Sequence, residues 1–136
     1  FDNKEVALRI ASPFYKREEQ SYNIEFKASD GSANPYLSLG ALIACGLDGI
    51  ERELDPGDPC EHDPALMTAE ALRRGKVRPL PSTMGEALEL LGQNGVLLDA
   101  LGPLLSRCYL AVRRSEQAVF AAHDLDFEVR HHFFRF

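Results

Sequence analysis

The sequence predicts an α+β fold that is mostly helical, with one antiparallel β-hairpin followed by about five helices. Two observations lead to this prediction. Near the N-terminus, two short stretches alternate apolar and polar residues, which is the pattern of half-buried strands. After residue 34, longer apolar stretches with helical spacing are separated by Gly and Pro. The length of 136 residues fits one domain, so residues 1–136 are predicted to form a single domain.

The two predicted strands carry one polar face. Val6, Leu8 and Ile10 mark the first strand. In the second strand, the apolar positions are Tyr22, Ile24, Phe26 and Ala28, and the polar positions are Asn23, Glu25 and Lys27. Alternate residues of a strand share a face, so those three polar side chains point the same way. In an antiparallel pair, Arg9 can join that face, although the alternation alone does not fix the register.

The stretch between the strands, residues 12–21, is expected to be a connecting arm with a solvated charged loop at residues 16–19. Helix signals follow it. Asn34 and Pro35 predict an N-cap and the first position of a helix that reaches about Leu54. Because its first three turns are almost wholly apolar, this helix is predicted to be central.

Further helices are predicted from caps and breakers along the rest of the chain. Thr68 can cap a short helix that ends at Gly75, and Thr83 with Glu86 fits a capping box. Gly102 and Pro103 separate a short helix at 96–101 from a long one that reaches about residue 122. The last predicted helix follows a cap at Asp124.

The totals exclude some classes of partner. A net charge of −6 argues against nucleic acid, and no uninterrupted run approaches the roughly 20 apolar residues of a membrane span. Cys45 and Cys108 are predicted to be buried thiols, and Cys60 lies in a polar loop. An odd number of cysteines without a C-x-x-C spacing favours a reducing, cytoplasmic location. The chain begins with Phe1 and not Met, so we expect a piece of a longer protein.

Glu25 is the candidate for metal chemistry, because a carboxylate on a strand face can ligate a hard divalent cation such as Mg²⁺ or Mn²⁺. The alternative is a solvated sheet face with cross-strand ion pairs from Glu25 to Arg9 or Lys27. Two other groups of metal-ligand residue types are predicted to have no such role. Residues 60–63 (Cys-Glu-His-Asp) are adjacent in a proline-rich loop, and His131-His132 is predicted to pack at a surface or interface.

Three motifs together resemble one family. They are Glu25-x-Lys27, the segment Asp30-Gly31-Ser32-Ala33-Asn34-Pro35-Tyr36-Leu37, and Gly46-Leu47-Asp48-Gly49-Ile50. In this order they are similar to the C-terminal part of the glutamine synthetase catalytic domain, and the resemblance extends over nearly the whole chain. It implies a partial catalytic domain from an ATP-dependent ligase that joins glutamate, or another carboxylate, to ammonia or an amine.

The resemblance also implies roles for single residues. Glu25 matches a ligand of a catalytic Mg²⁺ or Mn²⁺ ion beside the transferred phosphate. Lys4 and Arg9 match arginines that help hold the phosphates of ATP. Lys27 stands where the family has an Arg that contacts the substrate carboxylate and the phosphoryl group, and Asn23 replaces another Arg. Lys27 and Arg9 are therefore the predicted catalytic residues, Lys4, Arg9 and Asn23 the predicted ATP-binding residues, and Glu25 the predicted metal ligand.

The departures from Arg at Lys4, Asn23 and Lys27 leave room for substrates other than glutamate plus ammonia. Members of the family form large ring-shaped oligomers with sites between subunits, so a homo-oligomer and the remaining part of the parent chain are the expected partners. One carboxylate cannot hold a metal pair, and the isolated chain is expected to be inactive. The alternatives are a non-catalytic homologue kept for structure or assembly, and a helical binding module unrelated to catalysis.

Overall fold

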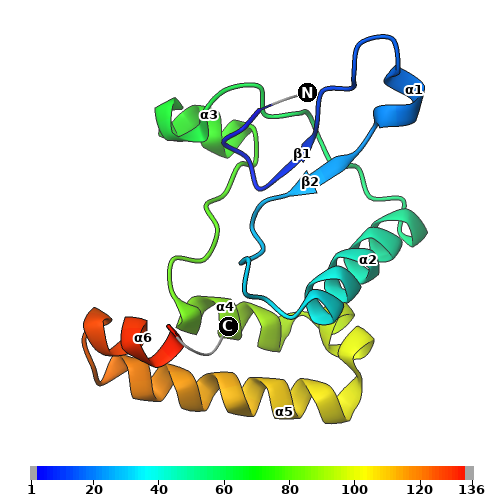
Figure 1. The fold of residues 1–136 in the computed structure, drawn as a ribbon. Helices are drawn as coiled ribbons and strands as arrows, with labels where there is room; N and C mark the ends of the chain where they lie inside the picture. Colours follow the sequence, from blue (N-terminus) through cyan, green and yellow to red (C-terminus); the bar gives the residue numbers. More distant parts are fainter. Residues whose placement is uncertain (1–2, 134–136) are drawn as a thin grey trace. The chain divides into compact units, whose positions relative to one another are not determined.

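The computed structural model describes residues 3–133, so Phe1, on which the expectation of a longer parent chain rests, lies outside them. Figure 1 traces the order of the helices and strands. Contacts between Cα atoms divide the chain into two compact units. The described residues up to Ala33 form the first unit together with Asp55–Pro79, and the second contains Asn34–Leu54 and the residues from Leu80 onward. That residues 1–136 form a single domain stays a prediction.

The first unit is built on a short hairpin, as predicted (Figure 1). Strands β1 (Leu8–Ile10) and β2 (Ile24–Phe26) pair antiparallel, with Arg9 directly opposite Glu25. Two backbone bonds extend the ladder. The N–H of Lys27 donates to the carbonyl of Ala7 (2.8 Å), and the N–H of Ala11 donates to the carbonyl of Asn23 (3.2 Å). The register therefore places Arg9, Asn23, Glu25 and Lys27 on one face.

The connection between the strands is more ordered than the predicted solvated loop. Residues Glu18–Ser21 form the one-turn helix α1. Side chains close this turn locally: Glu18 accepts from the N–H of Lys16 (2.9 Å), and the hydroxyl of Ser21 donates to the carbonyl of Arg17 (2.7 Å). The same hydroxyl accepts from the N–H of Phe14 (2.8 Å). Alternation of apolar and polar residues does not predict contacts of this kind. The charged sequence of this segment therefore gave no sign of the turn.

The remaining elements of the first unit are the 3₁₀-helix η1 (Pro64–Leu66) and the helix α3 (Ala69–Arg74). Each begins at a side-chain cap. Asp63 accepts from the N–H of Ala65 (2.9 Å), and Thr68 accepts from the N–H of Ala71 (3.2 Å). Helix α3 ends at Gly75, so its predicted cap and end are both confirmed.

The second unit is helical. It contains α2 (Pro35–Glu51), α4 (Met84–Gln93), α5 (Gly95–Ala121) and α6 (Leu125–His132). Helix α5 contacts both α2 and α4. The ring of Phe120, near the end of α5, lies 5.4 Å from the His131 ring and 5.0 Å from the His132 ring, which confirms packing for this histidine pair. With α3, five α-helices follow the hairpin within residues 3–133, as the sequence predicted.

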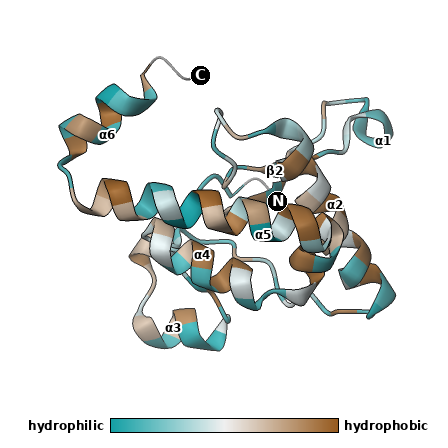
Figure 2. Ribbon diagram, turned by 90° about the horizontal axis from the view of Figure 1, so that it is seen from below, coloured by the Kyte–Doolittle hydropathy of each residue, from teal (hydrophilic) through white to brown (hydrophobic). Residues whose placement is uncertain are grey.

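Helix α2 begins as predicted, with the Asn34 side chain accepting from the N–H groups of Tyr36 (3.0 Å) and Leu37 (3.3 Å). The prediction that α2 is central is wrong for the described residues. None of its residues is buried, and Ile50 is 75% exposed. Figure 2 shows hydrophobic stretches along α2 and α5. Among the elements described, α5 is the partner that packs substantially on α2, and one neighbour cannot cover an apolar surface that extends around a helix.

The same exposure overturns the prediction of buried thiols. Cys45 on α2 and Cys108 on α5 are both exposed, and Cys60 is intermediate. An apolar neighbourhood in the sequence says which residues can be buried, whereas burial requires a second element over that face. Within residues 3–133, only Leu88 and Ser106 are buried.

Two local predictions need a finer description. Thr83 caps α4 by accepting from the N–H of Glu86 (3.2 Å), but the Glu86 carboxylate turns mainly to Ser82, accepting from its N–H (2.8 Å) and its hydroxyl (3.0 Å). These two hydrogen bonds are the main cause of the lowered pKa of Glu86. The Thr83 N–H, which is the return donor of the capping box, contributes less to this shift, so the return contact of the box is the weaker one.

The break predicted at Gly102 and Pro103 is confirmed inside α5, where Gly102 adopts φ 73° and ψ 164°. By length and composition alone, α5 is the one described helix that could cross a membrane. The sequence had offered no such run. The core helix of a soluble protein passes the same test, and the backbone leaves the helical conformation at Gly102.

Candidate functional site

The centre of the candidate site is a bidentate ion pair between the two strands of the hairpin. The Arg9 Nε atom donates to Oε2 of Glu25 (2.7 Å), and Arg9 Nη2 donates to Oε1 (3.0 Å). The pair follows from the register, because the two residues are direct cross-strand neighbours. The Arg9 side chain is 14% exposed, whereas the Glu25 side chain is 44% exposed. The carboxylate is therefore the member of the pair that a ligand can reach.

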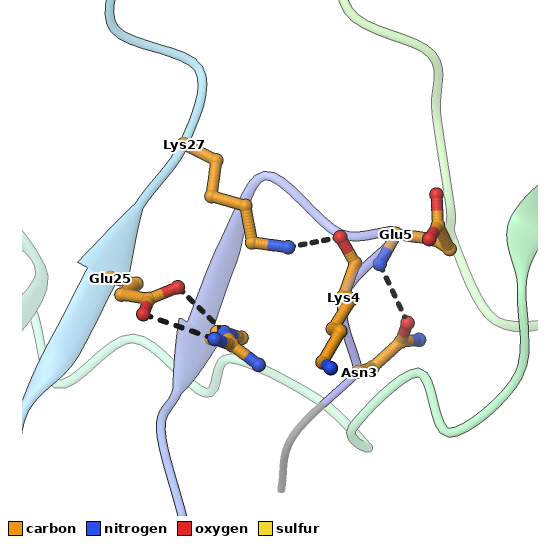
Figure 3. A network of polar contacts seen from close by, with 6 residues as sticks. Asn3, Lys4, Glu5, Glu25 and Lys27 are labelled. Carbon is orange, nitrogen blue, oxygen red and sulfur yellow. Dashed lines mark hydrogen bonds and ion pairs between the residues drawn. The ribbon is translucent and has the colours of Figure 1, made fainter.

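Two lysines lie on the same side of the pair. The Lys27 ammonium donates to the backbone carbonyl of Lys4, and Figure 3 shows this contact beside Glu25. The Lys4 side chain is drawn next to it, while the Glu5 carboxylate points away. The hairpin and the segment before it thus bring Lys4, Arg9 and Lys27 into the neighbourhood of one carboxylate. Their roles in catalysis and binding stay predictions.

These cations set the charge state of Glu25. Its pKa lies below the ordinary value of 4.5, first because the Arg9 side chain donates hydrogen bonds to the carboxylate. Partial burial acts in the opposite direction, and the positive charges of Arg9, Lys27 and Lys4 lower the pKa further. Glu25 is therefore an ionised carboxylate at neutral pH, in surroundings that also suit phosphate and carboxylate groups.

A divalent cation fits this carboxylate only in part. Mg²⁺ and Mn²⁺ prefer several oxygen ligands, and a carboxylate oxygen that accepts one hydrogen bond keeps a lone pair for a metal. The residues that the structure describes contain no group of three His, Cys, Asp or Glu side chains that could hold a metal ion. Glu25 can supply one ligand, and the others must come from elsewhere.

Asn23 shares the polar face, but its side chain is used locally. Its amide donates to the carbonyl of Ser21 (3.1 Å). Together with the α1 turn, Asn23 lines an open hollow whose other residues are Phe14, Arg17, Gln20, Ser21 and Tyr22. The structure therefore places Asn23 at the end of the hairpin toward α1, one residue before β2 begins and two residues before Glu25.

Comparison with known proteins identifies the family. The family model described as "Glutamine synthetase, catalytic domain" matches residues 1–132. This chain belongs to that family. The glutamine synthetase of Sulfolobus acidocaldarius is 35% identical over 128 residues, which are 93% of this chain and 27% of that protein. A gamma-glutamylpolyamine synthetase of Streptomyces coelicolor is 39% identical over 120 residues, which are 85% of this chain and 25% of that protein.

A third relative, the glutamine synthetase of Thermus thermophilus, is 36% identical over 114 residues, covering 84% of this chain and 25% of its own length. The chain thus spans about a quarter of the relatives it matches. The expected membership in the glutamine synthetase family is confirmed, and so is the expected fold of a partial catalytic domain.

Sequence reasoning missed the contacts that Asn3 makes beside the candidate site. In the structure its amide bridges to residues 57 and 59 positions away, donating to the carbonyls of Cys60 (2.7 Å) and His62 (3.0 Å). No spacing or alternation in the sequence relates Asn3 to that loop, so no local signal could have found the contact.

Proposed function

We propose that this protein is an ATP-dependent carboxylate–amine ligase of the glutamine synthetase type, and that the described chain supplies part of its active site. Family membership supports the reaction class. The observation that carries the site is the Arg9–Glu25 pair, with its carboxylate 44% exposed and two lysines beside it. A purely structural ion pair does not need the further cations that surround this carboxylate.

In the proposed reaction, an oxygen of the substrate carboxylate takes the γ-phosphoryl group of ATP, and ADP leaves. The amine nitrogen then attacks the acyl carbon and loses one proton to solvent, and inorganic phosphate leaves with the C–O bond electrons. Arg9 and Lys4 bind the ATP phosphates, and Lys27 orients the acid. Such residues act by positioning the reactants and stabilising charge that builds up in the transition state.

Glu25 is proposed to hold Mg²⁺ or Mn²⁺ through the lone pairs that Arg9 leaves on its carboxylate. When bound, the metal neutralises charge on the phosphoryl group being transferred. The low pKa of Glu25 keeps the carboxylate ionised and able to act as a ligand across the neutral pH range. The remaining ligands belong to the rest of the proposed full-length protein.

The acid and the amine are proposed as classes. Lys4 and Lys27 provide compact charges where the family has planar guanidinium groups, and Asn23 provides none. This weaker cation set accommodates substrates other than glutamate and ammonia. One relative is named as a gamma-glutamylpolyamine synthetase, so polyamines belong among the amines to be tested. We also propose a homo-oligomer in the cytoplasm, the latter supported by the three cysteines, which are all free.

The first prediction concerns Glu25. In the full-length protein, Glu25→Ala should lower kcat/KM for ATP-dependent ligation by about a hundredfold or more, because a preorganised charge at the transferred group is lost. The measurement is phosphate and ADP release with glutamate and a panel of ammonia, alkylamines and polyamines. Glu5→Gln is the matched control, since its carboxylate points away from the pair (Figure 3). Full activity of Glu25→Ala would contradict the metal role.

The departures at Lys4, Asn23 and Lys27 also favour a second candidate, a glutamine-synthetase-like module kept for structure or assembly. It predicts that the full-length protein binds no ATP and turns over no acid–amine pair. The isolated chain should be inactive on either account, because it offers one candidate metal carboxylate. ATP-dependent ligation by the purified 136-residue chain would refute that expectation.

A further inference from the structure

Asn3 uses its whole side-chain amide to join two distant segments of the first unit. An Asn amide has two N–H donors and one carbonyl acceptor. Nδ2 donates to the carbonyls of Cys60 (2.7 Å) and His62 (3.0 Å), and Oδ1 accepts from the N–H of Glu5 (3.0 Å). Asp cannot donate these bonds, and Ser cannot make all of them, so the position demands a primary amide of this length.

Asn3 fixes the turn formed by residues 3–5 (the 3–5 turn), and the Lys27 side chain donates a hydrogen bond to the same turn. The carbonyl of Lys4 lies between Asn3 and Glu5 in the chain and accepts from the Lys27 ammonium (Figure 3). The Lys27 backbone N–H donates to the carbonyl of Ala7 (2.8 Å), just beyond the turn. Two separate bonds from Lys27, just after β2, therefore connect the hairpin to this segment, and the described contacts of Asn3 hold the segment's near end to the Cys60–His62 loop.

Both lysines involved are drawn in the neighbourhood of Glu25, with the Lys27 ammonium on the Lys4 carbonyl (Figure 3). Their influence depends on the 3–5 turn, because one lysine belongs to it and the other donates to it. The contact between Asn3 and the Cys60–His62 loop can thus affect the surroundings of the Arg9–Glu25 pair, although neither Asn3 nor the loop touches a ligand bound there.

We propose that Asn3 is a positioning residue for this site: it anchors the 3–5 turn to the Cys60–His62 loop so that Lys4 and Lys27 lie beside the Arg9–Glu25 pair. The inference rests on the proposed function and deepens it, since Lys4 is the proposed ligand of the ATP phosphates. Asn3 itself binds no substrate. Loss of its amide leaves the cations present but no longer held in place.

The test uses the full-length protein, with ATP and Mg²⁺ affinity measured by calorimetry in the absence of the acid and amine. Asn3→Ala and the nearly isosteric Asn3→Asp should each weaken ATP binding about tenfold, as the loss of a supporting residue around a polar site commonly does. The KM for ATP should rise more than kcat falls. If Asn3 only maintained folding, the active fraction and hence kcat would fall with KM unchanged.

Two controls separate positioning from loosening of the loop. Asp63→Ala removes the cap of η1 in the same loop, where Asp63 accepts from the N–H of Ala65 (2.9 Å), without touching the 3–5 turn. It should leave ATP affinity within about twofold. In a double-mutant cycle, Asn3→Ala should add little to Lys4→Ala, because both changes remove the same interaction with ATP.

The outcomes distinguish the two proposals. ATP binding by the unaltered protein with the same affinity in Asn3→Ala would overturn the positioning role alone. Additive losses in the cycle, or an equal loss in Asp63→Ala, would also overturn it. Absence of ATP binding by the unaltered protein would overturn the proposed function and the positioning role together.

Discussion

At the scale of single residues, Glu25 illustrates how one position can satisfy two descriptions. The cross-strand ion pair to Arg9 is what a solvated sheet face would show, and the structure contains it. A metal ligand would need an accessible ionised carboxylate, and the structure contains that too. The two descriptions differ in what Glu25→Ala does. Loss of a metal ligand lowers the ligation activity, whereas loss of a purely structural ion pair does not.

The charge state of Glu25 gives a prediction about pH. Because its folded-state pKa lies below 4.5, this carboxylate stabilises the fold above the unfolded pKa, and the contribution disappears as pH falls through the lower folded value. Arg9→Gln removes the main cause and should move the pKa of Glu25 upward toward 4.5. The carboxyl carbon of Glu25, followed by NMR during an acid titration, reports this directly.

Arg17→Gln provides the matched control. Arg17 lies in the connection between the two strands, and it is not among the causes of the shift in the pKa of Glu25. An unchanged titration in Arg9→Gln, or an equal shift in Arg17→Gln, would mean that the measured pKa does not come from the cross-strand pair.

At the scale of elements, most boundaries came from caps that act within a few residues. Asn34, Thr68 and Asp124 accept the hydrogen bonds predicted for N-caps. Such contacts depend on near neighbours in the chain, so they can be predicted from the sequence. The failures were local contacts without a distinctive residue pattern, such as the α1 turn and the carboxylate of Glu86.

The break in α5 gives a prediction about stability. Gly102 has φ 73° and ψ 164°, a conformation open essentially only to Gly, and an added Cβ would meet no atom within 4 Å. Gly102→Ala should therefore lower the free energy of unfolding by about 1–3 kcal/mol through backbone strain alone. Urea unfolding followed by far-UV circular dichroism measures the change.

Gly49 in α2 is the matched glycine, since an added Cβ there also meets no atom within 4 Å and its φ is not positive. Gly49→Ala should be neutral or stabilising by up to about 1 kcal/mol. Equal effects of the two substitutions would show that the positive φ at Gly102 does not strain an alanine.

At the scale of the whole molecule, the exposed apolar surface is the main feature. Within the described residues, each unit leaves large hydrophobic side chains uncovered, including Ile24 (67% exposed) on β2 and Ile50 (75% exposed) on α2. Exposed apolar surface of this kind marks places where another molecule packs. It agrees with a chain that spans about a quarter of its relatives' length.

We therefore expect the isolated 136-residue chain to bind a hydrophobic dye and to self-associate at micromolar concentration. Ile50→Lys should reduce both effects, because it places a charge in the exposed apolar surface of α2. Dye fluorescence and size-exclusion chromatography with light scattering are the measurements. A monomer that binds no dye would show that these faces are covered in solution.

The sequence by itself determined the family, the hairpin, the five following helices and the residue types on the polar face, because these depend on motifs, alternation and local caps. Only the tertiary structure decided the rest: the register that sets Arg9 against Glu25, the clamp from Asn3 to the Cys60–His62 loop, and the exposure of α2 and of Cys45 and Cys108. The physical reason is distance along the chain. Local patterns fix how a segment folds, whereas burial and charge pairing depend on which other segment lies against it.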